Sequence, residues 1–204
     1  MTKRIQAKYK ISRSLGANLW GRPKDPFEFK NYGPGQHGPL RRRVQSDYAK
    51  QLRAKQALRR YYNITEKQFF NTYKKSAQNK GDTGANFVGM LERRLDMIVF
   101  RANFVPSIFA ARQFVTHRHV LVNGKTVNIP GYMLKEGDVV TIREKSRALP
   151  MVLQAMQAME RELPGYIEVD FNAFSAAFKK VPSLDEVPYP VKMEINLIIE
   201  FYSR

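Results

Sequence analysis

Proline and glycine are concentrated in the first 40 residues and restrict what this part of the chain can form. They are Pro23, Pro26, Pro34, Pro39, Gly16, Gly21, Gly33, Gly35 and Gly38. Proline lacks an N–H group and fixes φ, whereas glycine readily takes positive φ, so helices and strands do not persist where both recur. We therefore predict an extended, irregular arm over residues 1–45.

The charge of the chain is also uneven. Its 204 residues carry a formal net charge of +17. Residues 1–60 hold 16 Lys+Arg and three Asp+Glu, residues 61–149 hold 14 and seven, and residues 150–204 hold five and eight. Solubility does not require such a gradient, whereas a surface that lies along nucleic acid does, so we expect a polyanionic partner. The plain alternative is a solvated basic face without a ligand.

Several function classes are disfavoured by what the sequence lacks. Without cysteine the chain cannot hold a disulfide framework, a cysteine nucleophile or a Cys-ligated metal,. No apolar run is long enough to span a membrane, and no apolar segment follows the basic N-terminus as in a secretory signal. The three histidines are too scattered for a metal site, and no nucleotide-binding or hydrolase motif occurs. We expect no enzyme, no metal, no cofactor and no membrane partner.

Helical spacing begins after the arm. A capping residue at Ser46 precedes one predicted helix, and Thr65 with Gln68 forms a capping box at the start of another,. A third helix is predicted from Asn86, with its apolar stripe continuing to Ile98. The first two of these helices give a predicted helical region over residues 46–85.

A compact α+β module is predicted next. Ser107 can cap a helix over residues 107–118, and Asn123–Gly124 separates two β-prone runs in the manner of a type I′ hairpin turn,. A strand follows at residues 139–142. We assign this module to residues 86–149.

The last segment, residues 150–204, is expected to complete the helical domain. Pro150 suits the first turn of a helix, and residues 166–171 alternate as a strand does,. The C-terminal run NLIIEFYSR is β-prone and predicts a final strand with Leu197, Ile199 and Phe201 on one face. The predicted fold class is therefore α+β.

Cationic and amide side chains gather in residues 91–129. If the helices on either side of Pro106 pack by their apolar stripes, these side chains share one face, where guanidinium groups suit phosphate and amides reach 2′-hydroxyls. Ordinary surface charge is the alternative. With the basic arm and the helix after it, the candidate RNA-binding residues are Arg93, Arg94, Arg101, Ser107, Arg112, Gln113, His117, Arg118, Asn123, Lys125, Arg41, Arg42, Arg43, His37, Arg53, Lys55, Arg59 and Arg60.

Several uncommon motifs carry a resemblance to a known family. They are PGQHG at 34–38, SDY at 46–48, QLRAKQ at 51–56, LERRLD at 91–96, the AARQFVTH…VNG…VNIP run, GDVVTIREKS at 137–146 and the terminal EFYSR. In this order, and over essentially the whole chain, they resemble bacterial small-subunit ribosomal protein S4 (uS4). The module at 86–149 resembles the α-L RNA-binding domain of that family.

The resemblance implies a structural protein that binds small-subunit, 16S-type ribosomal RNA at the 5′ domain and nucleates assembly there. It also implies a role in translational accuracy, contact with small-subunit protein five and, in some members, repression of the protein's own mRNA. The implied location is the small subunit in the cytoplasm, with an organellar ribosome as the alternative. RNA-facing positions carried over are Arg93, Arg94, Ser107, Arg112, Gln113, His117, Asn123 and Lys125, and core positions are Leu95, Val122, Val127 and Ile129.

One departure from the family and two rival functions bear on this expectation. Many relatives have a four-cysteine zinc knuckle near the N-terminus, and this chain has none, so no zinc is carried over. An RNA-modifying enzyme would need a catalytic domain for which too little chain remains. An RNA chaperone with the same module is the alternative function, although such proteins lack the PGQHG…SDY region.

Overall fold

The computed structural model describes residues 7–40 and 46–203. The chain divides into two compact units, one of residues 1–71 and 189–204 and one of residues 72–188. Mixed helices and an antiparallel sheet confirm the predicted α+β class. The division falls within helix α3 (Glu66–Gln78).

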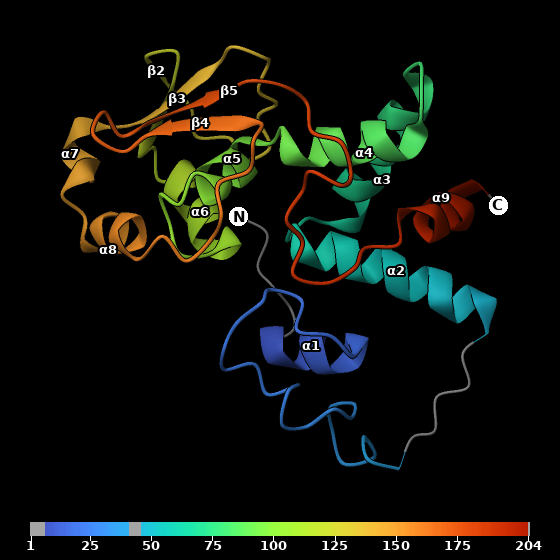
Figure 1. The fold of residues 1–204 in the computed structure, drawn as a ribbon. Helices are drawn as coiled ribbons and strands as arrows, with labels where there is room; N and C mark the ends of the chain where they lie inside the picture. The colour runs from blue at the N-terminus through green and yellow to red at the C-terminus, as the bar shows by residue number, and fades with distance from the viewer. Residues whose placement is uncertain (1–6, 41–45, 204) are drawn as a thin grey trace. The chain divides into compact units, whose positions relative to one another are not determined.

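In the first unit, two helices from opposite ends of the chain lie side by side. Helix α2 (Asp47–Tyr61) begins at Ser46, whose hydroxyl accepts from the N–H of Ala49, and α9 (Ile195–Ser203) packs against it (Figure 1). The side-chain amide of Gln51 donates to Glu200 over 3.0 Å. Both termini of the chain therefore contribute to this unit.

The predicted C-terminal strand is wrong, because residues 195–203 form helix α9. Ile195 and Ile198, three residues apart, are buried, whereas Asn196 and Glu200 are exposed. This is a helical burial pattern. The β-propensity of the run is overridden because a helix can place both isoleucines in the core of this unit.

The predicted arm is corrected in its first part. Helix α1 (Lys8–Leu15) precedes the first glycine and ends at Gly16, whose φ of 69° is left-handed. Residues 17–40 contain turns and bends but neither helix nor strand, as the prolines and glycines predicted. The predicted irregular arm was wrong for these eight helical residues, because they contain neither proline nor glycine.

The second unit contains a five-stranded antiparallel sheet in the order β2-β1-β3-β5-β4. The strands are β1 (Val120–Val122), β2 (Lys125–Thr126), β3 (Val139–Ile142), β4 (Ile167–Asp170) and β5 (Ser175–Phe178). Asn123 and Gly124 both have positive φ, which confirms the predicted hairpin turn,. We expected residues 150–204 to complete the helical region, whereas β4 and β5 extend this sheet through β3.

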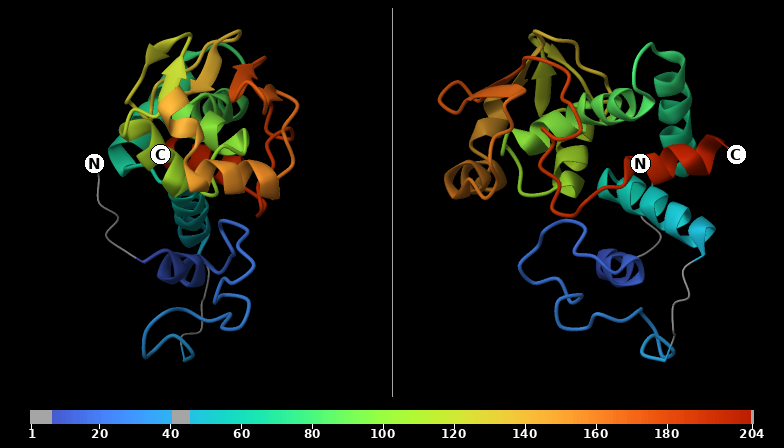
Figure 2. Two further views of the ribbon diagram at one scale, coloured as in Figure 1. Left: turned by 90° about the vertical axis from the view of Figure 1, so that its left-hand side faces the viewer. Right: turned by 45° about the vertical axis from the view of Figure 1, so that its right-hand side comes forward.

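Helices cover one side of the sheet. In Figures 1 and 2, α5 (Leu95–Arg101), α6 (Ile108–Thr116) and α8 (Pro150–Ala158) lie on the same side of it. Helix α4 (Thr83–Glu92) precedes α5, and α7 (Glu144–Arg147) precedes α8. All seven residues of α5 are buried, as are alternate strand residues such as Val140 and Phe178, so the core lies between sheet and helices,.

Candidate nucleic-acid interface

A loop from the sheet interrupts the predicted third helix and thereby positions two arginines. Backbone hydrogen bonds join residues 130–134 to residues 93–96. The N–H of Leu95 donates to the carbonyl of Tyr132, and the N–H of Leu134 donates to the carbonyl of Arg93, both over 2.9 Å. The helix predicted from Asn86 is therefore two helices, α4 and α5. Arg93 remains half-buried and donates through Nε to the carbonyl of Leu134 over 2.8 Å.

Arg94 and Arg112 converge on one buried carboxylate. The Asp96 side chain is 1% exposed and accepts two hydrogen bonds from Arg94, at 3.0 and 2.7 Å. Arg112, from α6, lies 3.9 Å from the same carboxylate. Burial lowers the pKa of Arg112 and the neighbouring Arg94 lowers it further, whereas Asp96 raises it. Asp96 thus ties α6 to the start of α5.

Arg101 lies in the interior, not on the candidate surface. It is 3% exposed, and its guanidinium forms two hydrogen bonds with Glu92 and one with the carbonyl of Pro188. Tyr166 also donates to Glu92, over 2.8 Å. The expectation that Arg101 faces RNA is corrected: its donors are occupied within the fold because a buried carboxylate requires them.

The C-terminal end of α6 presents exposed polar side chains. Ser107 caps the helix by accepting from the N–H of Ala110, so its hydroxyl serves the fold. Gln113, His117 and Arg118 are exposed. Arg118 has a φ of 64°, and this left-handed residue turns the chain from α6 into β1.

His119 follows this turn and is partly enclosed. Its ring stacks on Phe114 with centroids 4.8 Å apart, and its Nδ1 lies 2.8 Å from the hydroxyl of Ser146. Burial lowers the pKa of His119, and the nearby His117 and Arg143 lower it further. His119 is therefore mainly neutral at pH 7, and it contributes to this surface through its packing and not through a positive charge.

The hairpin carries one free cation and one amide that is already engaged. Asn123 donates to Asp138 and accepts from the N–H of Val139, so its side chain holds the hairpin against β3. Lys125 is exposed. His119 and the three residues of β1 separate Arg118 from the turn at Asn123–Gly124, and β1 alone spans about 10 Å,.

Three exposed cations here lack acidic partners. Among the described residues, no carboxylate lies within 4.0 Å of Arg118, Lys125 or Arg143. Arg143 was missed in the sequence because it follows a strand outside the 91–129 stretch. The backbone brings it here, since its N–H donates to the carbonyl of His119 over 3.0 Å. Unpaired cations of this kind are available to phosphate groups.

Helix α2 of the first unit contains a buried lysine. Lys55 is 7% exposed, donates to Glu66 over 2.8 Å and lies 4.2 Å from the centroid of Phe201. This placement corrects the expectation that Lys55 faces RNA. Arg59 lies 3.1 Å from Glu66, and burial, followed by the charge of Arg59, lowers the pKa of Arg60.

The remaining candidate residues of the N-terminal part are half-buried, exposed or outside the described residues. Arg53 is half-buried on α2, and His37 is exposed in the PGQHG turn. Arg41, Arg42 and Arg43 lie outside the described residues. The core positions expected from the resemblance include one correction, because Ile129 is 60% exposed, while Leu95 and Val122 are buried.

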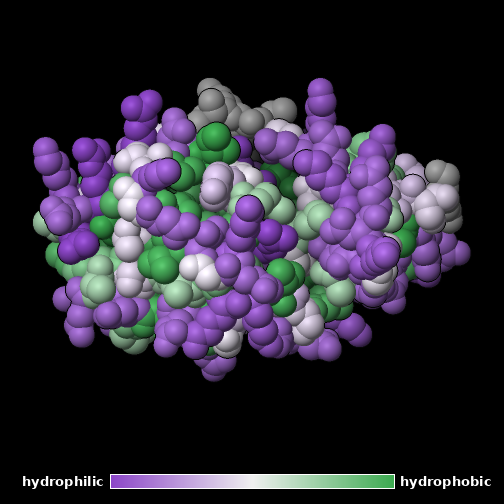
Figure 3. Space-filling view, turned by 90° about the horizontal axis from the view of Figure 1, so that it is seen from above, coloured by the Kyte–Doolittle hydropathy of each residue, from purple (hydrophilic) through white to green (hydrophobic). Residues whose placement is uncertain are grey.

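The visible surface suits a polar partner. Hydrophilic side chains cover most of the face shown in Figure 3, and the hydrophobic areas between them are small. Within residues 7–40 and 46–203, no group of His, Cys, Asp or Glu side chains could hold a metal ion. No helix of the described chain is both long and apolar enough to cross a membrane.

Comparisons with known proteins cover the whole chain. Residues 3–92 match the family described as ribosomal protein S4/S9 N-terminal domain, and residues 93–140 match the S4 domain. Similar proteins include those named small ribosomal subunit protein uS4 from Azorhizobium caulinodans (58% identical), Dinoroseobacter shibae (57%) and Brucella anthropi (58%). Each alignment covers 100% of both chains.

Proposed function

The chain belongs to the uS4 family of small-ribosomal-subunit proteins, and from this premise we propose that it binds 16S-type ribosomal RNA directly, as a structural component and not as an enzyme. The observation that carries the proposal is the set of unpaired cations at Arg118, Lys125 and Arg143. They lie in the unit whose residues 93–140 match the S4 domain.

Binding at this surface would combine charge with shape. Arg118, Lys125 and Arg143 would neutralise phosphates, and Gln113 could reach a 2′-hydroxyl group. Arg112 stands beside Asp96, so the carboxylate holds its guanidinium in place before RNA arrives. Because such contacts read backbone and 2′-hydroxyls, the surface would recognise folded RNA by shape rather than by base sequence.

The charge gradient supports a wider electrostatic contribution from the N-terminal part. Residues 1–60 carry 16 basic residues, of which Lys55 is buried in the described structure. We propose that the exposed ones, such as Lys24 and Lys30, add phosphate contacts, together with His37 and with Arg41, Arg42 and Arg43. Affinity would then fall by about 10³–10⁵ between 50 and 200 mM salt if roughly 6–10 phosphates of a duplex-like polyanion are neutralised.

Membership of the family supports finer proposals. We infer that the protein acts in the cytoplasm, nucleates assembly at the 5′ domain and contributes to translational accuracy. Partners would be small-subunit protein five and, for repression, its own mRNA. These roles require RNA contact, so each depends on the binding surface described above.

A salt-titrated binding assay tests the central proposal. The probe is the 5′ domain of 16S-type RNA, with an unstructured RNA of equal length as competitor. The Arg118→Ala/Lys125→Ala variant should bind more weakly and lower the slope of log affinity against log salt by about two. The Lys179→Ala/Lys180→Ala variant removes the same charge, but its cations pair with Glu168 and Glu186, and it should bind as the unaltered chain does.

Two results would contradict the proposal. An unchanged slope in the Arg118→Ala/Lys125→Ala variant would remove these residues from the interface. Equal affinity for the folded domain and the unstructured RNA would leave a nonspecific polyanion binder and favour the RNA chaperone function instead.

A further inference from the structure

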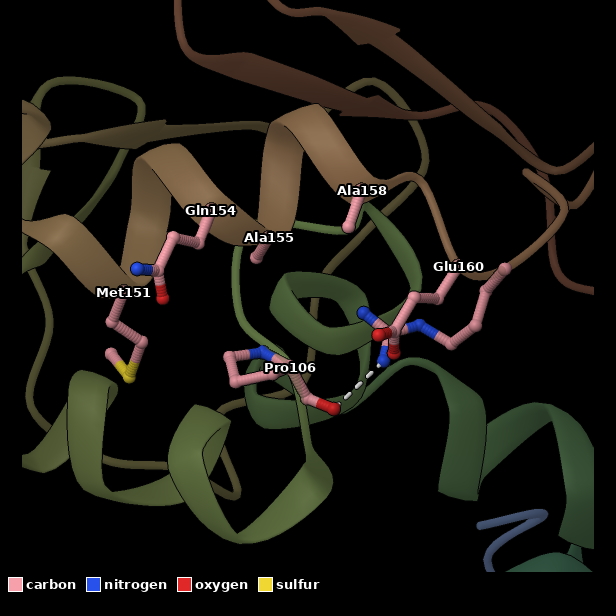
Figure 4. Close-up of a pocket in the computed structure, with 7 residues that line it drawn as sticks. Pro106, Met151, Gln154, Ala155, Ala158 and Glu160 are labelled. Carbon is pink, nitrogen blue, oxygen red and sulfur yellow. Dashed lines mark hydrogen bonds between the residues drawn. The ribbon is translucent and has the colours of Figure 1, made fainter. Parts of the chain in front are cut away.

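A small hollow of about 290 Å³ lies beside α8, in the second unit (Figure 4). Met151, Gln154, Ala155 and Ala158 line it from the helix, Pro106 from the segment before α6, and Glu160 from beyond the end of α8. The hollow lies at the lower limit of small-molecule pockets, which measure about 300–1,000 Å³. One long side chain would fill a hollow of this size.

Arg161, the cation that lines this hollow, has a structural role. Arg161 lines the hollow but donates to three oxygens: those of Asn103, Val105 and Pro106, over 2.9, 2.7 and 3.0 Å. Its guanidinium also lies 4.2 Å from the centroid of Phe100. Arg161 therefore holds the segment before α6 in place and is not available to attract an anion from outside.

Exposed apolar side chains lie on α8 and directly after it. Leu153 on α8 is 40% exposed, Met159 at its C-terminal cap is 54% exposed and Leu163 is 41% exposed. Met159 ends the helix with a φ of 38°, in the left-handed region where glycine is the usual residue,. Leu153 lies on the opposite face of α8 from the residues that line the hollow, because those residues follow the i, i+3, i+4, i+7 spacing of one helix face,. Met159 lies between Ala158 and Glu160 in the sequence, both of which line the hollow, so it is the exposed apolar side chain nearest to the hollow along the chain.

The charge of this segment is opposite to that of the rest of the chain. Residues 150–178 contain four acidic residues and one basic residue, the engaged Arg161, in a chain with a net charge of +17. Glu160 and Glu162 are exposed, and no cation of the described chain lies within 4.0 Å of either. Phosphate groups would be repelled here, whereas a cationic segment would be attracted.

We propose that α8 and the turn after it, residues 150–163, dock a basic segment of another protein of the small subunit. An apolar side chain, or the aliphatic part of a lysine or arginine, would enter the hollow over Ala155 and Ala158. Flanking cations would meet Glu160 and Glu162, and Met159 would be covered. This inference rests on the proposed function in one respect, namely that the small subunit supplies the partner.

Site-specific photo-crosslinking tests the docking surface. The full chain with p-benzoylphenylalanine in place of Gln154, an exposed residue that lines the hollow, is reconstituted into small subunits from defined proteins and RNA. Illumination should join it to a peptide of another subunit protein that contains at least two Lys or Arg beside an apolar residue. The same reagent at Val181, which is 40% exposed but distant in sequence from α8, serves as the position control and should not yield that peptide.

Charge-reversal variants test whether the crosslinked partner is held by electrostatic attraction or only lies close to α8. Glu160→Lys/Glu162→Lys should lower the yield of the crosslink at least tenfold. Glu168→Lys/Asp185→Lys, which reverses two other exposed acids, should leave it unchanged. RNA affinity of the free chain should be the same in both variants, which shows that the RNA-binding unit remains folded.

The outcomes distinguish this inference from the proposed function. A crosslink from position 154 to RNA, or to no molecule in subunits that contain the chain, would overturn the docking surface alone. An unchanged yield after charge reversal would also overturn it. A chain that neither binds the RNA nor enters subunits would overturn the proposed function together with the docking surface.

Discussion

Buried acids decide which arginines of the second unit are available to RNA. Glu92 is fully buried and occupies Arg101, whereas Asp96 occupies Arg94 and also stands 3.9 Å from Arg112. A buried carboxylate without a cation is costly, so the interior cations have a structural task first. Sequence spacing cannot distinguish these arginines from the exposed ones, because all of them lie close together along the chain.

Substitution of Asp96 tests its role as a common anchor. Asp96→Asn leaves Arg94 without its buried counter-charge, and the free energy of unfolding should fall by about 3–5 kcal/mol. Chemical denaturation monitored by circular dichroism measures the change. Glu168→Gln breaks an exposed pair with Lys179 and should cost at most about 1 kcal/mol,. Equal losses in the two variants would show that Asp96 is no anchor.

His119 predicts a pH dependence of stability. Its folded-state pKa is lowered, first by burial and then by His117 and Arg143, so the unfolded chain binds more protons as the pH falls. The stabilisation is present above the unfolded pKa of about 6.5 and is lost as the pH falls toward the lower folded value. Melting curves at pH 7.5 and 5.5 should show a smaller drop for His119→Gln than for the unaltered chain. An equal drop would contradict the assignment.

At the scale of elements, local signals and long-range pairing contribute differently. The caps at Ser46 and Ser107 and the Asn123–Gly124 turn are confirmed, since each depends on residues at most three apart,. The break between α4 and α5 depends on the loop of residues 130–134, about 40 positions later. A periodic apolar stripe gives no indication of such a partner.

The hairpin turn gives a prediction for one element. Gly124 has a φ of 76°, which an L side chain adopts at a cost of about 1–2 kcal/mol, so Gly124→Ala should lower stability by that amount,. It should also weaken RNA binding, because Lys125 lies in the same turn. Gly165→Ala is the matched control, since that position has neither positive φ nor any heavy atom within 4 Å. Denaturation midpoints of the two variants should therefore differ clearly.

At the scale of the whole molecule, each unit has its own core. The first contains Leu58, Tyr61 and Ile198, and the second contains Val140 and Phe178. Residues 189–204 return to the first unit after the second is complete, so the chain's end stabilises its beginning. The charge gradient runs across this arrangement, with basic residues early and acidic residues late.

Because each unit has its own core, we predict that each unit can unfold while the other stays folded. Ile198→Ala removes a fully buried side chain and should cost about 2–5 kcal/mol in the first unit,. Hydrogen exchange should then show lost protection in α2 and α9 while β3 and β5 remain protected. Val140→Ala should give the reverse pattern. Loss of protection throughout the chain in either variant would show that the units unfold as one.

The sequence alone determined what depends on composition and on neighbouring residues. The basic charge gradient, the irregular segment at residues 17–40, the helix caps, the hairpin and the family resemblance are all of this kind. The tertiary structure decided what depends on distant partners. It made Ile195–Ser203 a helix and enclosed Lys55, Arg94 and Arg101, because burial forces each apolar face and each charge to find a partner that linear spacing does not reveal,.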